Sequence, residues 1–195
     1  MTCGTLKQAL LIILIILVLI LAISLIPFTS AVSGNMIFIQ AIGFIAFGFG
    51  IWAFLQKDDK RLKIIQAIQS LILATHFFLL GSQGAVVACV ITAIRNITAL
   101  TSVAKTLAPL FILACIGLGL YRYNVWTDIL PTLAVLVSTI GIFYLEKVPM
   151  RLCLLFATSM WIIHNAAVGS IGPFFMELFM FTANINTIRR MRRDS

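Results

Sequence analysis

The chain has 195 residues, of which 62% are hydrophobic and 10% charged, and its formal net charge is +8. With a mean hydropathy of +1.12, this composition is too apolar for a soluble domain of the same length. The basic residues stand between and beyond apolar segments, so they indicate membrane topology and argue against a nucleic-acid-binding protein. The sequence therefore predicts an all-α integral membrane protein whose main partner is the lipid bilayer.

Apolar runs long enough to cross a membrane follow one another along the chain. A span needs about 20 residues at a rise of about 1.5 Å per residue. Residues 9–28 are uniformly aliphatic and longer than the core of a signal peptide, so we expect an uncleaved anchor, with a cleaved signal as the alternative. The seven further predicted helices are 36–55, 64–80, 84–104, 107–121, 129–145, 152–168 and 172–189.

Charged residues separate several of these predicted helices. Residues 56–63 and 146–151 are predicted to be short charged loops, and 122–128 a loop on the opposite side. With a cytoplasmic N-terminus, twelve of the fourteen Lys and Arg residues fall on the cytoplasmic side; Arg122 falls outside and Arg95 within a helix. Inner membrane proteins carry such an excess of basic residues in their cytoplasmic loops. We therefore expect both termini in the cytoplasm.

The two histidines, His76 and His164, each begin the pattern H-x4-G-S-x-G. A shift of 88 residues without a gap superimposes the two patterns, and it also places Asn184 on Asn96. Matches between aliphatic residues mean little in so apolar a chain, but these polar matches are specific. We interpret them as an internal duplication.

The duplication also predicts how the two copies are oriented. Both histidine patterns are expected outside and both basic loops inside, since the same shift places Arg151 on Lys63. Two three-helix copies joined by one helix are then parallel, with a pseudo-twofold axis along the membrane normal. The predicted fold is eight transmembrane helices in a 1 + 3 + 1 + 3 order: an anchor (1–35), repeat one (36–105), a linker helix (106–123), and repeat two with a basic tail (124–195).

Polar residues inside apolar helices mark the candidate site. Asn96 and Asn184 each lie 12 residues beyond a turn glycine, about 18 Å along the helix and near the midplane. They either link helices or bind a solute between the repeats. Arg95 either extends to the cytoplasmic face or binds an anionic solute group. Together with Trp161, which is either a packing or a stacking residue, these are the predicted binding residues for an unidentified small polar solute.

Two polar stripes are predicted on the third helices of the copies. One contains Ser170, Glu177 and Asn184 at seven-residue spacing, and the other contains Ser82, Cys89 and Asn96. Two turns of helix separate successive members, so each set lies on one face. We expect the two stripes to face each other across the pseudo-axis.

Ionisable residues near the outer turns are candidates for gating or proton coupling. Glu177 is costly in the membrane if ionised, so we expect it to be protonated, paired with His164, or in contact with water. The histidines either bond to nearby backbone or titrate near neutral pH. The predicted gating residues are His76, His164, Glu177, Ser82 and Ser170.

Catalytic and metal-binding patterns are missing from the sequence. It has no Gly-rich phosphate loop and no H-E-x-x-H motif. Four widely spaced cysteines indicate neither a disulfide framework nor a metal site. We expect no enzyme, no cofactor and no metal; an intramembrane enzyme that uses His164 and Glu177 is the alternative.

Several segments resemble the signatures of a known family. The sequences HFFLLG (76–81), AIRN (93–96), WIIHN (161–165) and GSIG (169–172) are similar to those of the YgjV-type bacterial inner-membrane proteins. The resemblance covers about residues 36–192. It implies a bacterial inner membrane location and carries no settled activity.

The predicted layout is also similar, more distantly, to that of the SWEET and PQ-loop transporters. In SWEET transporters an asparagine from the third helix of each repeat lines the central site, and Asn96 and Asn184 fall in the corresponding helices. The chain departs from that family, since it has no Pro-Gln pair and a helix-bending proline only at Pro131, opposite Gly43. We expect a small-solute transporter with alternating access, possible as a homo-oligomer; a non-transporting structural or signalling membrane protein is the alternative.

Overall fold

The computed structural model describes residues 35–54, 59–145 and 147–193, so the anchor expected at 9–28 lies outside the described residues. The described part is helical and contains no strand, which confirms the predicted all-α class. Its seven α-helices and one short 3-10 helix are α2 (Met36–Phe54), α3 (Asp59–Leu79), α4 (Gln83–Thr98), α5 (Ala104–Tyr121), η1 (Trp126–Asp128), α6 (Ile129–Tyr144), α7 (Lys147–Val168) and α8 (Ile171–Arg193).

Three of the described segments are long and apolar enough to cross a membrane. They are Met36–Ala53, Trp126–Tyr144 and Lys147–Val168. Shorter apolar helices at Lys63–Leu79, Gln83–Thr98 and Lys105–Tyr121 lie between them in the chain. Multi-pass membrane proteins have this composition, with helices that satisfy their own backbone hydrogen bonds.

Two helices begin inside segments that were predicted to be charged loops. α3 begins at Asp59 and α7 at Lys147. Lys and Arg favour the helical state, and Pro149 lies in the first turn of α7, where its missing N–H costs nothing. Both helices therefore begin within the charged segments, whereas the predicted helices began only with the apolar residues at 64 and 152.

α4 ends at Thr98, earlier than the predicted boundary near 104. The backbone N–H groups of Leu100 and Thr101 bond to carbonyls only three residues back, at 3.1 and 2.9 Å. The Thr101 hydroxyl also donates to the Thr98 carbonyl oxygen, at 2.7 Å. Local hydroxyl bonds of this kind compete with the helical pattern, and they turn the chain toward α5.

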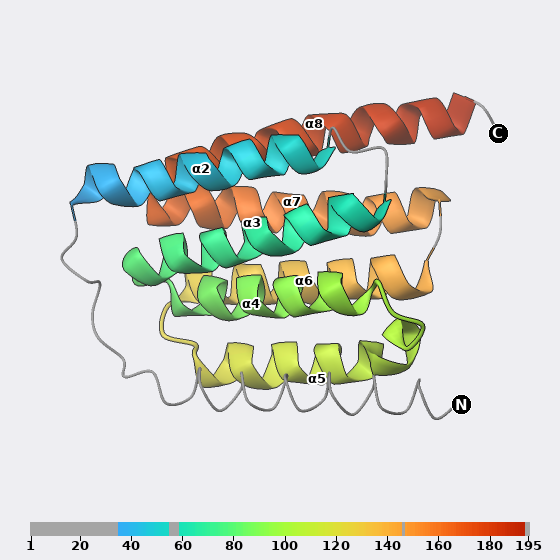
Figure 1. Ribbon diagram of the computed structural model, residues 1–195, viewed down its shortest axis with the longest axis horizontal. Helices are drawn as coiled ribbons and strands as arrows, with labels where there is room; N and C mark the ends of the chain where they lie inside the picture. The colour runs from blue at the N-terminus through green and yellow to red at the C-terminus, as the bar shows by residue number, and fades with distance from the viewer. Residues whose placement is uncertain (1–34, 55–58, 146, 194–195) are drawn as a thin grey trace.

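Six helices form a closed ring. The pairs in contact are α2–α3, α3–α4, α4–α6, α6–α7, α7–α8 and α8–α2. Figure 1 shows the helices lying side by side along one common direction, with α2 and α8 at one edge of the molecule and α5 at the opposite edge. α3 and α7 are thus held on opposite sides of the ring, and α5 packs outside it on α4 and α6.

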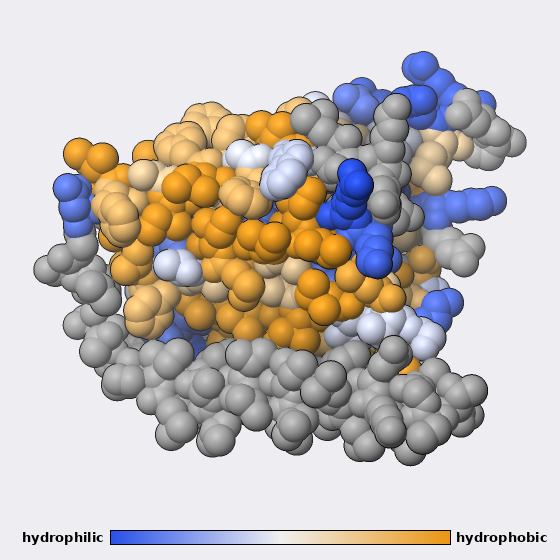
Figure 2. All heavy atoms as spheres, viewed as in Figure 1, coloured by the Kyte–Doolittle hydropathy of each residue, from blue (hydrophilic) through white to orange (hydrophobic). Residues whose placement is uncertain are grey.

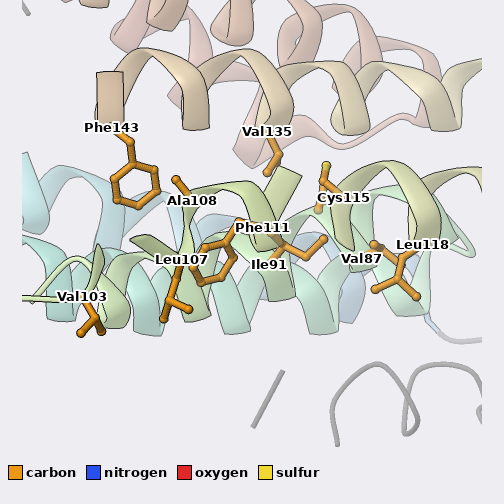
Figure 3. Packing of buried hydrophobic residues seen from close by; sticks show 11 residues of the cluster. Val87, Ile91, Val103, Leu107, Ala108, Phe111, Cys115, Leu118, Val135 and Phe143 are labelled. Carbon is orange, nitrogen blue, oxygen red and sulfur yellow. The ribbon is translucent and has the colours of Figure 1, made fainter. Parts of the chain in front are cut away.

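An apolar core joins α5 to the ring. Leu107 and Phe111 of α5 pack with Ile91 of α4, and Val135 and Phe143 of α6 point toward them (Figure 3). Phe111 is 1% exposed. Close packing of aliphatic and aromatic side chains provides much of the attraction between helices in lipid.

The two ends of the helix bundle differ in chemistry. We call the end with the turns at Gly81 and Gly169 the histidine end, because each of these turns follows a histidine helix. The basic end is the opposite one, where α3 and α7 begin and α8 finishes with Arg189, Arg190, Arg192 and Arg193. In Figure 2 hydrophilic side chains gather at the basic end, while the face between the ends is mostly hydrophobic.

Candidate functional site

The two histidines exchange serine partners between the two halves of the chain. His76 Nε2 of α3 lies 2.8 Å from Ser170 Oγ, which directly precedes α8. His164 Nε2 of α7 lies 3.1 Å from Ser82 Oγ, which directly precedes α4. Both rings are fully buried, at 0% exposure. Each hairpin turn is therefore hydrogen-bonded to the helix that leads into the other turn.

The second nitrogen of each ring bonds to backbone. His76 Nδ1 lies 2.8 Å from the Ile39 carbonyl oxygen, and His164 Nδ1 lies 3.0 Å from that of Thr127. A carbonyl oxygen only accepts hydrogen bonds, so Nδ1 carries the ring proton. In the neutral ring Nε2 then accepts a hydrogen bond from the serine hydroxyl. Ile39 and Thr127 are also 88 residues apart.

Glycine conformation sets the position of each serine. Gly81 and Gly169 have φ values of 78° and 70°, in the left-handed region. The next residue, Ser82 or Ser170, then donates its N–H to the carbonyl oxygen five residues back, at 2.9 Å in both turns. These are helix-ending turns that glycine adopts without strain.

Polar side chains from the other half of the chain bind each turn. Gln40 of α2 donates to the Gly169 carbonyl oxygen at 2.6 Å and accepts the Ile171 N–H at 3.1 Å. Asp128, 88 residues after Gln40, accepts the Gly84 N–H at 3.3 Å. Each turn is thus hydrogen-bonded to a polar side chain from the opposite half of the chain.

His164 and Glu177 are not brought together. Both ring nitrogens of His164 bond elsewhere, to Ser82 and Thr127, and the half-buried Glu177 lines a cavity. Of the three arrangements expected for Glu177, the pair with His164 is therefore not made in this structure. The histidines have the bonds expected of residues that fasten the hairpins.

Polar residues line a cavity of about 780 Å³ inside the ring. Its walls come from α3, α4, α6, α7 and α8. The volume falls within the range of small-molecule sites, about 300–1,000 Å³. Three pairs of polar wall residues are 88 positions apart: Lys63 and Arg151, Ser70 and Thr158, Asn96 and Asn184.

All four predicted binding residues line this cavity, as does Glu177. The other four predicted gating residues lie in the exchanged contacts at the histidine end. α4 and α8 lie opposite each other in the ring, since α4 packs on α3 and α6 while α8 packs on α2 and α7. Their asparagines meet only across the cavity, and Cys89 belongs to an apolar cluster with Phe77.

Arg95 is buried in the cavity wall, with 6% of its surface exposed. Instead of extending to the aqueous end, it donates from Nη1 to Ser138 Oγ at 3.0 Å and to Thr139 Oγ1 at 3.1 Å. Its Nε has no hydrogen-bond partner. Two hydroxyls of α6 therefore hold the guanidinium in place while one donor stays unused.

Two bases near the basic end, 88 positions apart, bond to the third helix of their half or to the residue that follows it. Arg151 Nη1 donates to Asn184 Oδ1 at 3.3 Å. Lys63 Nζ donates to the carbonyl oxygen of Ala99, the residue after α4, at 3.2 Å. One of the two predicted asparagines is therefore already bonded to a base in the cavity wall.

Aromatic side chains close the cavity toward the histidine end. Phe77 stacks on Trp161 with ring centroids 5.7 Å apart, and both rings contact His164 edge-on. Phe77 is 0% and Asn165 1% exposed. Lys63 and Arg151, at the other end of the lining, are partly exposed. The cavity is closed at the histidine end and reaches toward the basic end.

Sequence reasoning missed several wall residues. Asn165 lines the cavity with an Oδ1 atom that is buried and has no hydrogen-bond partner. Ser70 and Thr158 were not singled out, although their 88-residue spacing was visible in the sequence. Gln66 and Gln69 lie on the same face of α3 as Ser70, at helical spacing. The positions of polar residues on the second helix of each half were the unused signal.

The comparisons with known proteins agree with this membrane architecture. The sequence pattern of Imp-YgjV, described as bacterial inner membrane protein, matches residues 37–195. The chain belongs to this family. A curated relative, inner membrane protein YgjV of Escherichia coli (strain K12), is 34% identical over 154 residues, covering 78% of this chain and 84% of the relative. No solved structure matches the chain.

Membership of the Imp-YgjV family places the cavity in a bacterial inner membrane protein. Polar and charged side chains in membrane helices face the bundle interior or a water-filled space, as the cavity wall does here. Among the described residues, no group of three or more His, Cys, Asp and Glu residues could hold a metal ion. The polar groups of the cavity wall can form hydrogen bonds with a ligand, and most of its charged side chains are basic.

Proposed function

We propose that this protein is a small-solute transporter, not an enzyme, that binds its solute in the cavity between α3, α4, α6, α7 and α8. The observation that carries the proposal is a cavity of about 780 Å³ among membrane helices, whose wall combines polar and charged side chains with apolar ones. Structural membrane helices gain little from enclosing a polar space, because polar groups in the bilayer need partners or water. A solute path gives that space a function.

We further propose that the chain is an anchor followed by two parallel three-helix repeats joined by α5. Correspondences at a spacing of 88 residues support this, including the partners of the two histidines and the paired wall residues. A twofold axis along the bundle would exchange α2 with α6, α3 with α7 and α4 with α8, and the ring of contacts is unchanged by that exchange. Transporters built from such repeats bind solutes at the repeat interface.

In the proposed mechanism the two repeats rock against each other around the cavity. Both termini and the basic end face the cytoplasm, according to the excess of basic residues there. The structure then corresponds to an inward-facing state, because the cavity is closed at the histidine end. Opening the outer side requires the exchanged His–Ser bonds to break.

The proposed roles of the residues follow from their positions. Asn96, Asn184, Arg95 and Trp161 bind the solute from the cavity wall. The His76–Ser170 and His164–Ser82 bonds form the outer gate. Glu177, a carboxylate in the wall without a basic partner among the described residues, is the candidate for proton coupling.

The test is solute entry into proteoliposomes, followed by light scattering as the vesicles swell. Vesicles are placed in isosmotic solutions of single solutes: sugars, polyols, amino acids, and potassium salts of organic and inorganic acids. Valinomycin and a protonophore are added to the salts so that charge movement does not limit entry. At least one solute should enter faster than into protein-free vesicles.

Variants connect that flux to the cavity. The double variant Asn96→Ala and Asn184→Ala should reduce the flux at least about tenfold, the effect of losing hydrogen bonds of about 1 kcal/mol at each amide. Asn186→Ala is the matched control, because Asn186 is exposed on the same helix, α8, outside the cavity. Unchanged flux in the double variant would place the path elsewhere. If no solute enters at all, the structural or signalling alternative stands.

A further inference from the structure

Positive charge dominates the cavity wall. Among the described lining residues there are three bases, Lys63, Arg95 and Arg151, and one acid, Glu177. Glu177 does not balance the three bases even when it is ionised. In a low-dielectric protein interior an uncompensated positive charge attracts anions strongly.

All hydrogen bonds of these bases go to neutral acceptors in the described part of the chain. Arg95 bonds to the hydroxyls of Ser138 and Thr139. Arg151 bonds to an amide oxygen and Lys63 to a backbone carbonyl. A purely structural buried cation is usually paired with a carboxylate, because an unpaired charge is costly to bury. The positive charge of these bases is therefore not neutralised by a carboxylate that bonds to them, and an anionic ligand could neutralise it.

Arg95 carries the strongest feature. It is 6% exposed, lines the cavity, and has an Nε donor without a hydrogen-bond partner. Its Nη1 is held by two hydroxyls that face it from α6. A cavity-lining guanidinium that is held on Nη1 and keeps a buried Nε donor unpaired still lacks an anionic partner, and carboxylate and phosphate groups fit its planar fork.

We propose that the cavity takes a water-soluble organic anion, whose carboxylate or phosphate oxygens bind Arg95. This rests on the proposed function, because it names the class of solute for the same cavity. Arg151 and Lys63, near the partly exposed basic end, raise the local anion concentration at the entrance. The amides of Asn96 and Asn184 bind the uncharged part of the solute.

Thermal unfolding of the purified full chain in a non-ionic detergent tests the binding. The probes are lactate, succinate, aspartate and inorganic phosphate as sodium salts, with sodium chloride at equal ionic strength and glycerol as references. A bound anion raises Tm beyond the shift given by sodium chloride at equal ionic strength, and above its Kd the rise follows the logarithm of its concentration. At least one probe anion should give such stabilisation.

Variants assign the binding to Arg95. Arg95→Gln should weaken the apparent affinity by about 10- to 100-fold, the effect of losing a hydrogen bond from a charged group. Arg95→Lys keeps the charge and should weaken it less. Arg61→Gln is the control, because Arg61 is exposed on α3 and outside the cavity lining. If Arg95→Gln does not fold, Arg151→Gln should still weaken binding several-fold.

Three results would overturn the proposal: no stabilisation by any probe anion beyond that of sodium chloride, equal stabilisation of Arg95→Gln and the parent protein, or stabilisation only by phosphatidylglycerol, which would indicate a lipid headgroup. The flux measurements separate this failure from failure of transport. Entry of neutral or cationic solutes without anions would leave a transporter with a different solute class. Anion binding without any flux would leave a binding protein.

Discussion

His76 Nε2 lies 2.8 Å from Ser170 Oγ, although 94 residues separate the two positions in the chain. The equivalent bond joins His164 to Ser82 at 3.1 Å. Each turn therefore depends on a histidine from the opposite half. The two hydrogen bonds together hold the hairpin tips side by side at the histidine end.

The first prediction concerns the stability of this end. Ser170→Ala and Ser82→Ala should each destabilise the protein by about 1–3 kcal/mol, because each leaves a buried ring nitrogen without its partner. The two effects should be similar in size, and the double variant should show coupling between them, because the Phe77 ring contacts both histidines. Tm in detergent measures both single variants and the double variant.

Ser159→Ala is the control for loss of a hydroxyl. Ser159 lies on α7 and donates only to the Leu155 carbonyl oxygen of its own helix, at 2.9 Å. Its removal should change Tm little. An unaffected Tm in either Ser170→Ala or Ser82→Ala would mean that the histidines do not hold the turns together.

The second prediction concerns access to the cavity from each side of the membrane. In a variant without its four native cysteines, Thr187→Cys should react with a membrane-impermeant maleimide from the cytoplasmic side, because Thr187 lines the partly exposed end. Asn165→Cys should not react from outside, since Asn165 is 1% exposed behind the aromatic closure. Labelling in right-side-out and inverted vesicles measures this.

Breaking the outer gate should reverse part of that pattern. Ser82→Ala together with Ser170→Ala should increase labelling of Asn165→Cys from outside several-fold, because the state closed at the histidine end loses two bonds that stabilise it. Asn124→Cys is the positive control, since Asn124 is exposed at the histidine end. Labelling of Thr187→Cys from outside would show that the bundle has the opposite orientation.

The third prediction concerns close helix approach. A Cβ at Gly172 would lie 2.7 Å from the Gly43 carbonyl carbon, and a Cβ at Gly84 would lie 2.6 Å from the Asp128 carbonyl oxygen. Backbone does not yield cheaply, so Gly172→Ala and Gly84→Ala should each cost about 1–3 kcal/mol or more. Gly48→Ala is the control, because its Cβ would meet nothing within 4 Å. Thermal unfolding separates them; equal Tm values would contradict the packing.

The fourth prediction concerns the corner that leads into α6. Asp128 is 2% exposed, and its carboxylate accepts the backbone N–H groups of Gly84, Asn124 and Val125 at 3.2–3.3 Å. Asp128→Ala should therefore destabilise by about 2 kcal/mol or more, as several buried donors lose their acceptor.

Asn124→Ala is the matched control for that corner. It keeps the backbone N–H that Asp128 accepts and removes only a side-chain bond of 3.4 Å to the Arg122 carbonyl oxygen. Its Tm should stay close to that of the parent protein. A loss as large as that of Asp128→Ala would show that the loop side chains, not the carboxylate, hold the corner.

Sequence reasoning reached the all-α class and five of the residues in the cavity wall because both depend on strong local signals. Apolar runs predicted the helices, and the depth of Asn96 and Asn184 along their helices predicted a shared level. The 88-residue shift aligns the two histidine turns in the sequence itself. These are properties of sequence spacing, which a straight helix preserves.

The partners of the buried polar groups were beyond such reasoning. Pairing with His164 was one of three arrangements expected for Glu177, but the ring of His164 bonds to Ser82 and Thr127 instead. Arg95 was expected either to extend to the cytoplasmic face or to bind an anionic solute group, and the hydroxyls of Ser138 and Thr139 that hold it could not be foreseen. The depth of a side chain in the membrane follows from its residue number along the helix. The direction in which the side chain points depends on which helices pack against each other.

The exchange of serines between the turns has a consequence for the origin of the chain. Neither half alone supplies both members of a His–Ser bond at its own turn. If one ancestral three-helix unit gave rise to both halves, two separate copies of it would have satisfied each other's histidine across a symmetric homodimer. Gene fusion through α5 would then have preserved the interface between two identical subunits of an ancestral homodimer.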